Sequence, residues 1–309
     1  MKIRDEFPGA FNFLKCIGLK NEESVLILTD ELSNIYTIKL LRKIFTTKCS
    51  KVCIDILPKN LQEDFPYRIC EEIKKFDVII LAASQSWYHV PTRRKAKYKY
   101  KKRIIECYNL TLEMLKKGAL CADYKNVSLI TRNLRKSFLP NSLLTINTKE
   151  KGKFIARMKN IFQETGYYNK SGSGGNLPAG EISFGIIKGS ASGEIIFNVS
   201  FDNIGRLEKY PLRVLIDKDK VISVHGKFKK VLEDLFLRDI RLKNIAEIGI
   251  GTNPYAILGH SVLEDEKKIG TVHIGFGNNT YFGGTVGGPH FDGVFSPTAI
   301  MVDEKPLIF

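Results

Sequence analysis

A short apolar run at residues 24–29, SVLILT, has the length and composition of a β-strand buried on both faces. Two similar runs follow it, KVCIDIL at residues 51–57 and DVIILA at residues 77–82. The segments between them, residues 32–44 and 62–75, are predicted to be helices. Because strands that alternate with helices form βαβ units, this pattern predicts a small doubly wound domain with a parallel sheet. No GxGxxG sequence follows the first strand, so the usual dinucleotide-binding loop is not expected.

The second half of the chain has a different pattern, with more glycine and shorter strands. A polar, turn-rich stretch, NKSGSGGN at residues 169–176, precedes it. Residues 143–159 could form a helix or a hairpin, and we favour the hairpin. Further on, the pattern predicts strands at residues 182–187, 194–199 and 270–276, a hairpin across residues 213–224, and one clear helix at residues 228–236. This spacing is typical of an antiparallel, β-rich domain.

The length and composition agree with two domains. A chain of 309 residues, of which 43% are hydrophobic, can bury two cores. We therefore predict an α/β protein in which residues 1–140 form a parallel-sheet α/β domain and residues 141–309 form a β-rich α+β metal-binding catalytic domain. The longest aliphatic run, VIILAA at residues 78–83, is far too short to span a bilayer. The first residues lack a signal-peptide pattern, so we expect a cytoplasmic protein without membrane contact.

The chain is basic, with 48 Lys and Arg against 33 Asp and Glu and a formal charge of +15. Eight of these basic residues lie in RRKAKYKYKKR at residues 93–103, close to Trp87 and Tyr88. Proteins bind single-stranded nucleic acid through such mixtures of cations and aromatic rings. Two other interpretations of this stretch are that it binds an anionic substrate or partner protein, or that it is a solvated segment leading into a helix. Because no nucleic-acid-binding motif accompanies the stretch, a nucleic-acid partner is not expected.

Cysteine and histidine are segregated along the sequence. All six cysteines lie in the first 121 residues without a CxxC pair, which is typical of reduced, mostly buried thiols. Three of the five histidines, His260, His273 and His290, lie within 31 residues near the end. The histidine-rich end is therefore the better candidate for chemistry.

Two of these histidines occur with a carboxylate. His290 and Asp292 are two residues apart on an extended segment, so their side chains share a face. His273 lies in a predicted strand, TVHIGFG, that ends in small residues. Two imidazoles and one carboxylate are a minimal ligand set for a first-row transition metal, and the alternative is that these are satisfied polar residues at strand ends.

Two glutamates extend this set. Glu181 follows a Pro- and Gly-containing turn and immediately precedes a predicted strand. Glu247 is the single acid in the otherwise apolar run IAEIGIG. A buried glutamate is costly unless it is paired or bound to a metal, so Glu247 is either a ligand or the ion-pair partner of Lys243 or Arg241.

These motifs, taken in order, resemble the aminopeptidase T family (also called aminopeptidase S or PepS) of two-metal, thermophilic-type leucyl aminopeptidases. The similarity rests on NLPAGE at residues 176–181, AEIG at 246–249, DE at 265–266 followed by GTVHIGFG at 270–277, and HFD at 290–292. The similarity covers residues 175–303. In the first half of the chain it is limited to the βαβ layout.

The resemblance implies that this chain hydrolyses the N-terminal residue of peptides through a water activated by two divalent ions, Zn, Co or Mn. It implies five metal ligands, with one shared carboxylate: Glu181, Glu247, His273, His290 and Asp292. It also implies Glu266, or less favourably Glu264, as the general base, and Tyr281 as a hydrogen-bond donor to the oxyanion. A homodimer is expected on the same ground.

The sequence is also compatible with two other functions. His273, His290 and Asp292 alone would suit a single non-haem Fe(II), as in the dihydroxypyridine ring-cleaving dioxygenases that a branch of this fold resembles. Alternatively, the chain is a catalytically degenerate homologue that binds a peptide or nucleic acid through residues 93–103. We favour the aminopeptidase because both Glu181 and Glu247 are present and one iron needs neither.

Overall fold

The computed structural model describes residues 3–58 and 64–309, and the chain forms two compact units. We call them unit 1, which is Met1–Ser128 with Glu164–Ala179, and unit 2, which is Leu129–Gln163 with Gly180–Phe309. This division differs from the expected single boundary after residue 140 in two ways: residues 129–140 belong to unit 2, and residues 164–179 return to unit 1. None of the helices in the described part of the chain has the length and apolar character needed to cross a bilayer.

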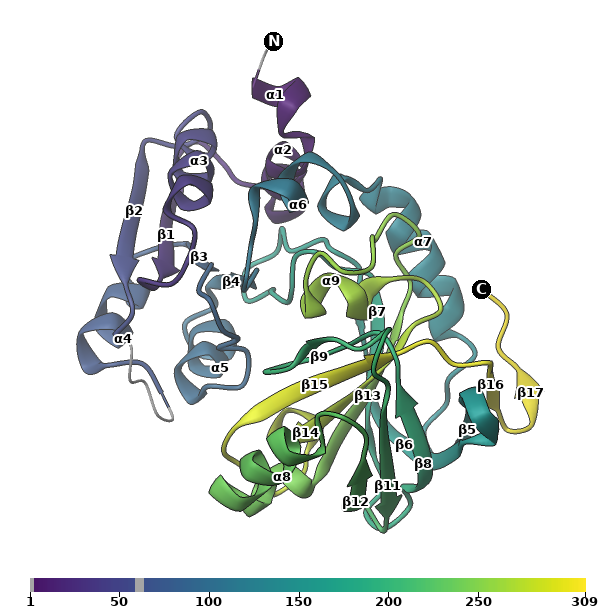
Figure 1. The fold of residues 1–309 in the computed structure, drawn as a ribbon. Helices are drawn as coiled ribbons and strands as arrows, with labels where there is room; N and C mark the ends of the chain where they lie inside the picture. The colour runs from purple at the N-terminus through teal and green to yellow at the C-terminus, as the bar shows by residue number, and fades with distance from the viewer. Residues whose placement is uncertain (1–2, 59–63) are drawn as a thin grey trace. The chain divides into compact units, whose positions relative to one another are not determined.

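Unit 1 is built on a four-stranded parallel sheet. Its strands pair in the order β2-β1-β3-β4 (Figure 1), with bounds β1 Ser24–Thr29, β2 Lys51–Ile56, β3 Val78–Leu81 and β4 Arg103–Glu106. The three strands predicted from apolar runs are confirmed, and β4 is additional. Beyond β4, the returning segment lies along the sheet edge, since the amide of Glu106 donates to the carbonyl of Gly175 and the amide of Leu177 donates to the carbonyl of Glu106.

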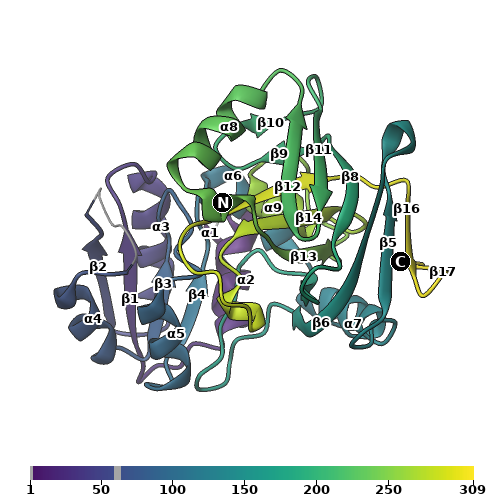
Figure 2. The same cartoon turned by 90° about the horizontal axis from the view of Figure 1, so that it is seen from below.

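Side chains of the central strand β1 alternate between two cores. Val25 and Ile27 pack with helices α2 (Pro8–Ile17) and α3 (Ile35–Phe45), whereas Leu26 and Leu28 pack with α4 (Tyr67–Lys74) and α5 (Pro91–Tyr98). Figure 2 shows α4 and α5 on one side of the strands and α3 on the other. The sheet is thus covered on both faces, which confirms the doubly wound prediction.

Two helices of unit 1 show why predicted and observed ends differ. Helix α3 begins after Asn34, whose side-chain oxygen accepts hydrogen bonds from the amides of Tyr36 and Thr37. Helix α4 begins at Tyr67, later than the predicted start, because Pro66 disfavours helical backbone in the residue before it. Residues 62–63 of that prediction lie outside the described residues.

Unit 2 is a curled, mainly antiparallel sheet of 13 strands, which confirms the predicted β-rich second half. The favoured hairpin is confirmed as β5 (Leu143–Asn147) and β6 (Lys153–Glu164), which pair antiparallel. The other strands are β7 Glu181–Ile186, β8 Ser192–Phe197, β9 Ser200–Phe201, β10 Gly205–Arg206, β11 Leu212–Asp217, β12 Lys220–His225, β13 Ile245–Gly251, β14 Val272–Gly277, β15 His290–Phe295, β16 Ala299–Val302 and β17 Lys305–Pro306.

The predicted helix at residues 228–236 is confirmed as α8, Lys229–Arg238. Besides α5, five further helices were not predicted from the sequence. They are α1 Ile3–Glu6, α2, α6 Leu112–Lys116, α7 Tyr124–Arg135 and α9 Val262–Lys267, with 3₁₀ turns η1 Ala119–Cys121, η2 Lys149–Lys151, η3 Ile240–Lys243 and η4 Thr280–Phe282. They were not predicted although α2 and α7 are amphipathic and are ten and twelve residues long.

Four neighbouring strands in the order β15-β14-β13-β7 form the part of unit 2 that positions the candidate site. One face of these strands is apolar, with Ile248 and Ile250 of β13 and Ile274 and Phe276 of β14 in the unit 2 core. Because strand side chains alternate, the polar and glycine positions between them lie on the opposite face. The candidate ligands of unit 2 are on that face.

Candidate metal centre

The strand register places each candidate ligand across from a glycine. His273 of β14 is opposite Gly249, and Glu181 of β7 is opposite Gly251. On the next pairs Glu247 and Asp292 are both opposite Gly275, and His290 is opposite Gly277. A side chain at Gly249 would put its Cβ 1.9 Å from Cε1 of His273. The alternation of glycine with isoleucine and phenylalanine in IAEIGIG and VHIGFG therefore makes room for the charged groups.

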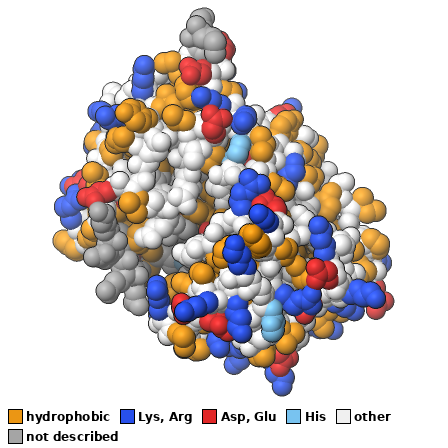
Figure 3. Space-filling model, viewed as in Figure 1, with side chains coloured by type: hydrophobic (Ala, Val, Ile, Leu, Met, Phe, Trp, Pro, Cys, Tyr) orange, Lys and Arg blue, Asp and Glu red, His pale blue; other side chains and the backbone are white. Residues whose placement is uncertain are grey.

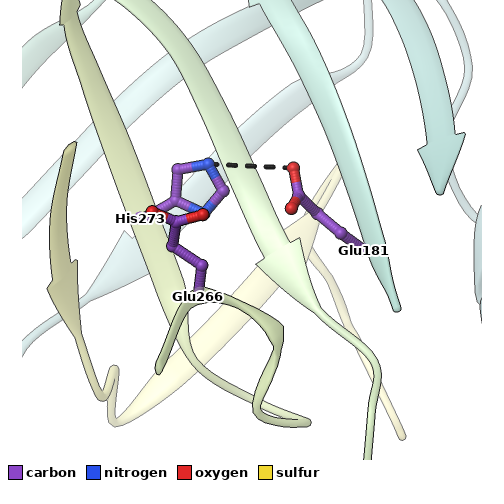
Figure 4. Close-up of side chains that lie close together, drawn as sticks. All are labelled: Glu181, Glu266 and His273. Carbon is purple, nitrogen blue, oxygen red and sulfur yellow. Dashed lines mark ion pairs between the residues drawn. The ribbon is translucent and has the colours of Figure 1, made fainter. Parts of the chain in front are cut away.

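A first group of potential ligands consists of Glu181, Glu266 and His273. One ligand atom from each lies within 4.8 Å of the others, and all three side chains are buried. They come from β7, α9 and β14, and Figure 4 shows the two carboxylates and the imidazole turned toward one another. Nε2 of His273 is 3.8 Å from Oε1 of Glu181.

A second group consists of Glu247, His290 and Asp292, again with ligand atoms within 4.8 Å of one another. Nε2 of His290 is 3.2 Å from Oδ1 of Asp292 and 3.6 Å from Oε1 of Glu247. The same Glu247 oxygen is 3.4 Å from Nε2 of His273, in the first group. Glu247 is thus a carboxylate that the two groups share.

The orientation of His290 is that of a metal ligand. Its Nδ1 is 3.0 Å from the carbonyl oxygen of Asn278. Because a carbonyl can only accept a hydrogen bond, Nδ1 carries the proton, and Nε2 is turned toward the carboxylates of Glu247 and Asp292. Ligating histidines commonly have one nitrogen fixed by a backbone carbonyl in this way.

The side chains of the two ligand groups shift one another's pKa values. Burial alone would raise the pKa of Glu247, but hydrogen bonds from His273 and His290 hold that pKa well below its usual value. Burial opposes protonation of the imidazoles, yet neighbouring carboxylates, above all Glu181, raise the pKa of His273 to about 10. The carboxylate of Asp292 likewise raises the pKa of His290 well above its usual value. These carboxylates therefore stabilise positive charge between them. They would stabilise a divalent cation there more strongly than a protonated imidazole.

The donor set fits a bound cation. Among the described residues, Oε1 of Glu266 is buried without a hydrogen-bond partner, which is costly for a polar atom. Glu247, His290 and Asp292 add two carboxylates and an imidazole, which are groups that bind first-row divalent metals. Carboxylates and imidazoles of this kind suit Zn, Co, Mn or Fe(II). The residues present therefore fit a divalent metal ion.

Two charged residues of the site were not anticipated from the sequence. The ammonium group of Lys267 contacts Oε2 of Glu181 and lies 3.2 Å from Oε2 of Glu266. Asp202 accepts a hydrogen bond from the amide of Asp292 over 3.0 Å, and burial together with the charge of Asp292 raises the pKa of Asp202 to about 7. Lys267 directly follows Glu266 in the sequence, which is the one signal that could have pointed to it. No motif marks Asp202.

The proposed acid and base groups have different surroundings. Glu266 belongs to the first group, whereas Glu264 accepts hydrogen bonds from the amide of Ile257 and pairs with Nδ1 of His260 at 3.0 Å. Glu264 is therefore used to hold the local fold, which favours Glu266 as the base. Tyr281 is on η4, where its ring packs against Phe162 at 4.9 Å between centroids. Its role as an oxyanion donor stays a prediction.

The basic stretch at residues 93–103 is partly used to build unit 1. Arg93 is buried with its guanidinium 3.5 Å from the ring centroid of Tyr88, and Arg103 is buried against Glu23. The ammonium of Lys97 donates to the carbonyl of Gly174 over 2.8 Å, and burial lowers its pKa to about 8. In the face shown in Figure 3, basic side chains are interspersed with acidic and hydrophobic ones. The interpretation of the stretch as a wholly solvated segment is therefore wrong for these three residues.

Comparison with known proteins gives similarity at the level of fold. No protein-family model and no curated protein sequence matches the chain. Among solved structures, it is similar to 2,5-dihydroxypyridine dioxygenase from Pseudomonas putida KT2440, with a TM-score of 0.76, 19% identity, and 97% of this chain and 95% of that chain covered. It is also similar to wild-type AmpT from Thermus thermophilus, an aminopeptidase, with a TM-score of 0.61, 13% identity, and 98% and 95% covered. At these identities the likeness shows a shared fold, and both neighbours are enzymes.

Proposed function

We propose that this protein is a metal-dependent aminopeptidase that removes the N-terminal residue of peptides. The observation that supports this most is the position of Glu247, whose Oε1 lies 3.4 Å and 3.6 Å from the Nε2 atoms of His273 and His290. A carboxylate shared between two ligand groups is the arrangement expected of a hydrolytic metal centre. The fold likeness to AmpT agrees with this proposal.

In this proposal each residue of the site has a separate role. Bound divalent metal would act as a Lewis acid and lower the pKa of a bound water. Glu181, Glu247, His273, His290 and Asp292 would be its ligands. Oε1 of Glu266 accepts no hydrogen bond from the described residues, so it is the carboxylate oxygen best placed to take a proton from the attacking water. Tyr281 would donate a hydrogen bond to the oxyanion.

The direct test is hydrolysis of leucyl amides by the purified full chain loaded with Zn, Co or Mn. We expect the wild type to hydrolyse them, and Glu247→Gln and His290→Ala each to lower kcat/KM by about 100-fold or more, because each removes a ligand. His225→Ala is the control, since His225 is an exposed residue of β12 bonded to Ser223 at 3.2 Å. Absence of hydrolysis with all three metals, or wild-type rates in both ligand variants, would reject the proposal.

A single-iron ring-cleaving dioxygenase is the second candidate. The ion pairs of Lys267 with Glu181 and Glu266 favour it, because they occupy two of the carboxylates and leave His273, His290 and Asp292, beside Glu247, to hold a single ion. Oxygen consumption with a dihydroxypyridine by the Fe(II)-loaded chain, without leucyl-amide hydrolysis, would support this candidate over the peptidase. A peptide substrate, a homodimer and a cytoplasmic location remain part of the aminopeptidase proposal, and light scattering of the purified chain tests the dimer.

A further inference from the structure

Lys267 is an unusual member of the site because its side chain is only 1% exposed. Lysine is rarely buried unless its ammonium group is paired. Here the ammonium contacts Oε2 of Glu181 and lies 3.2 Å from Oε2 of Glu266, so it lies against both carboxylates of the first ligand group.

The backbone around Lys267 is held in place by neighbouring segments. The carbonyl oxygen of Lys267 accepts a hydrogen bond from the amide of Asn253 over 2.8 Å. The hydroxyl of Thr271 donates to the carbonyl oxygens of Asp265 and Lys268 over 2.8 Å and 2.7 Å. Ser261 caps the start of α9 by accepting from the amide of Glu264. The lysine side chain therefore extends toward the two carboxylates from a fixed position.

A cation bound to the first group would lie against the same two carboxylates that this ammonium contacts through their Oε2 atoms. Two positive charges a few ångströms apart in a buried site repel strongly, so the ammonium and a divalent ion would compete for Glu181 and Glu266. The second group differs. Within the described part of the chain, the ion-pair partners of Glu247 and Asp292 are imidazoles, not lysine or arginine.

We infer that the ammonium of Lys267 takes the place of one of the two ions of a two-metal centre. The chain would then bind one divalent ion, at Glu247, His290 and Asp292, and removal of Lys267 would open a second site at Glu181, Glu266 and His273. This inference rests on the metal-binding part of the proposed function. It revises both the number of ions that the sequence resemblance implies and the ligand set, since Glu181 and His273 would bind no ion in the wild type.

The test counts metal ions in the full chain without using activity. A chelator first removes metal from the protein, which is then titrated with Mn²⁺ in a calorimeter. Elemental analysis of the washed protein counts the Mn²⁺ ions that stay bound. We expect one equivalent in the wild type and two in Lys267→Met, which keeps the length of the side chain without its charge. Lys267→Gln is the alternative variant should the methionine variant fold poorly. Lys268→Met is the matched control, since the Lys268 ammonium donates to the carbonyl of Pro254 over 3.3 Å, and we expect it to bind one.

Electron paramagnetic resonance of the Mn²⁺ forms gives an independent readout. One ion should give an isolated six-line spectrum in the wild type, whereas two ions about 3.5–4 Å apart in Lys267→Met should give a coupled spectrum. Addition of Glu181→Gln to Lys267→Met should restore one equivalent.

The outcomes separate the inference from the function on which it rests. Two equivalents in the wild type, or one equivalent in both Lys267 variants, would overturn the inference and leave a metal-dependent enzyme intact. No bound metal in the wild type would overturn both.

Discussion

Glu106 is a fully buried carboxyl group at the end of β4 in unit 1. Its Oε1 accepts a hydrogen bond from the amide of Trp87, and its Oε2 has no partner among the described residues. Burial raises the pKa of Glu106 to about 7, although the positive charge of Arg93 opposes this. The carboxyl group is therefore protonated in the folded chain at pH values where an exposed glutamate is charged.

This pKa makes stability depend on pH. Because the folded pKa lies above the ordinary value of 4.5, the folded state holds the proton more tightly, and stability falls as pH rises from about 4.5 to about 7. The full difference corresponds to about 3 kcal/mol. We expect Glu106→Gln to remove this part of the slope. Urea unfolding at pH 4.5 and pH 8, followed by the fluorescence of Trp87, the single tryptophan, measures it.

The exposed Glu113 provides the control, since Glu113→Gln should leave the pH dependence unchanged. The same loss of stability with pH in wild type and Glu106→Gln would show that Glu106 does not retain its proton in the folded state.

At the level of single residues, the sequence indicated the candidate ligands but not the charged residues that contact them. Glu247 was recognisable because an acid in an apolar run needs a partner. Lys267 was not, because a lysine beside acidic residues is ordinarily a solvated surface pair. Its burial depends on contacts between α9 and β7, which are 86 residues apart in sequence at the Lys267–Glu181 pair. Such contacts leave no local pattern.

At the level of elements, β13 and β14 act together as the support of the site. Each strand alternates large apolar residues, which face the core, with glycine or a ligand on the other face. Gly249 and Gly275 are the positions where this alternation matters most. A Cβ at Gly275 would lie 2.6 Å both from Cγ of Glu247 and from Cε1 of His290.

We therefore expect Gly275→Ala to displace the side chains of Glu247 and His290, because the added Cβ would lie 2.6 Å from an atom of each. Metal affinity should fall by about tenfold or more, as is typical when a ligand loses its orientation. Calorimetric titration measures the affinity, and circular dichroism checks that the chain is folded. Gly287→Ala is the control, because no atom lies within 4 Å of the Cβ it would add. Wild-type affinity in folded Gly275→Ala would contradict the role given to this glycine.

Strands that are apolar on both faces were predictable, whereas the charged helix α9 was not. The strands at residues 24–29, 51–57 and 77–82 were evident because both faces of a parallel sheet are buried. Helix α9, with the sequence VLEDEK, has five buried residues of which four are charged, so nothing in its composition indicates a buried helix. It is stabilised by its Ser261 cap and by hydrogen bonds from Thr271.

At the level of the whole molecule, the candidate metal ligands all belong to unit 2, whereas unit 1 has its own sheet and cores. A sequence-based boundary after residue 140 could not show that residues 164–179 return to unit 1. That return depends on hydrogen bonds between Glu106 and residues about 70 positions later. Composition indicates how many domains a chain can form, but not how often it passes between them.

Metal binding should consequently stabilise unit 2. A ligand at 100 times its Kd adds about 2.7 kcal/mol to the folded state that binds it. We expect hydrogen exchange with mass spectrometry to show slower exchange in β13, β14 and β15 on addition of Mn²⁺, and unchanged exchange in β1 and β3. Equal slowing in both units would contradict a site confined to unit 2, and Glu247→Gln should abolish the effect.

The most direct measurement is anomalous X-ray diffraction from crystals of the full chain grown with Mn²⁺ or Zn²⁺. A metal centre at β13 and β15 predicts an anomalous peak about 2.0–2.3 Å from Nε2 of His290, with carboxylate oxygens of Glu247 and Asp292 also bound. No peak at these three residues at saturating metal, or a peak only at surface carboxylates elsewhere, would contradict it.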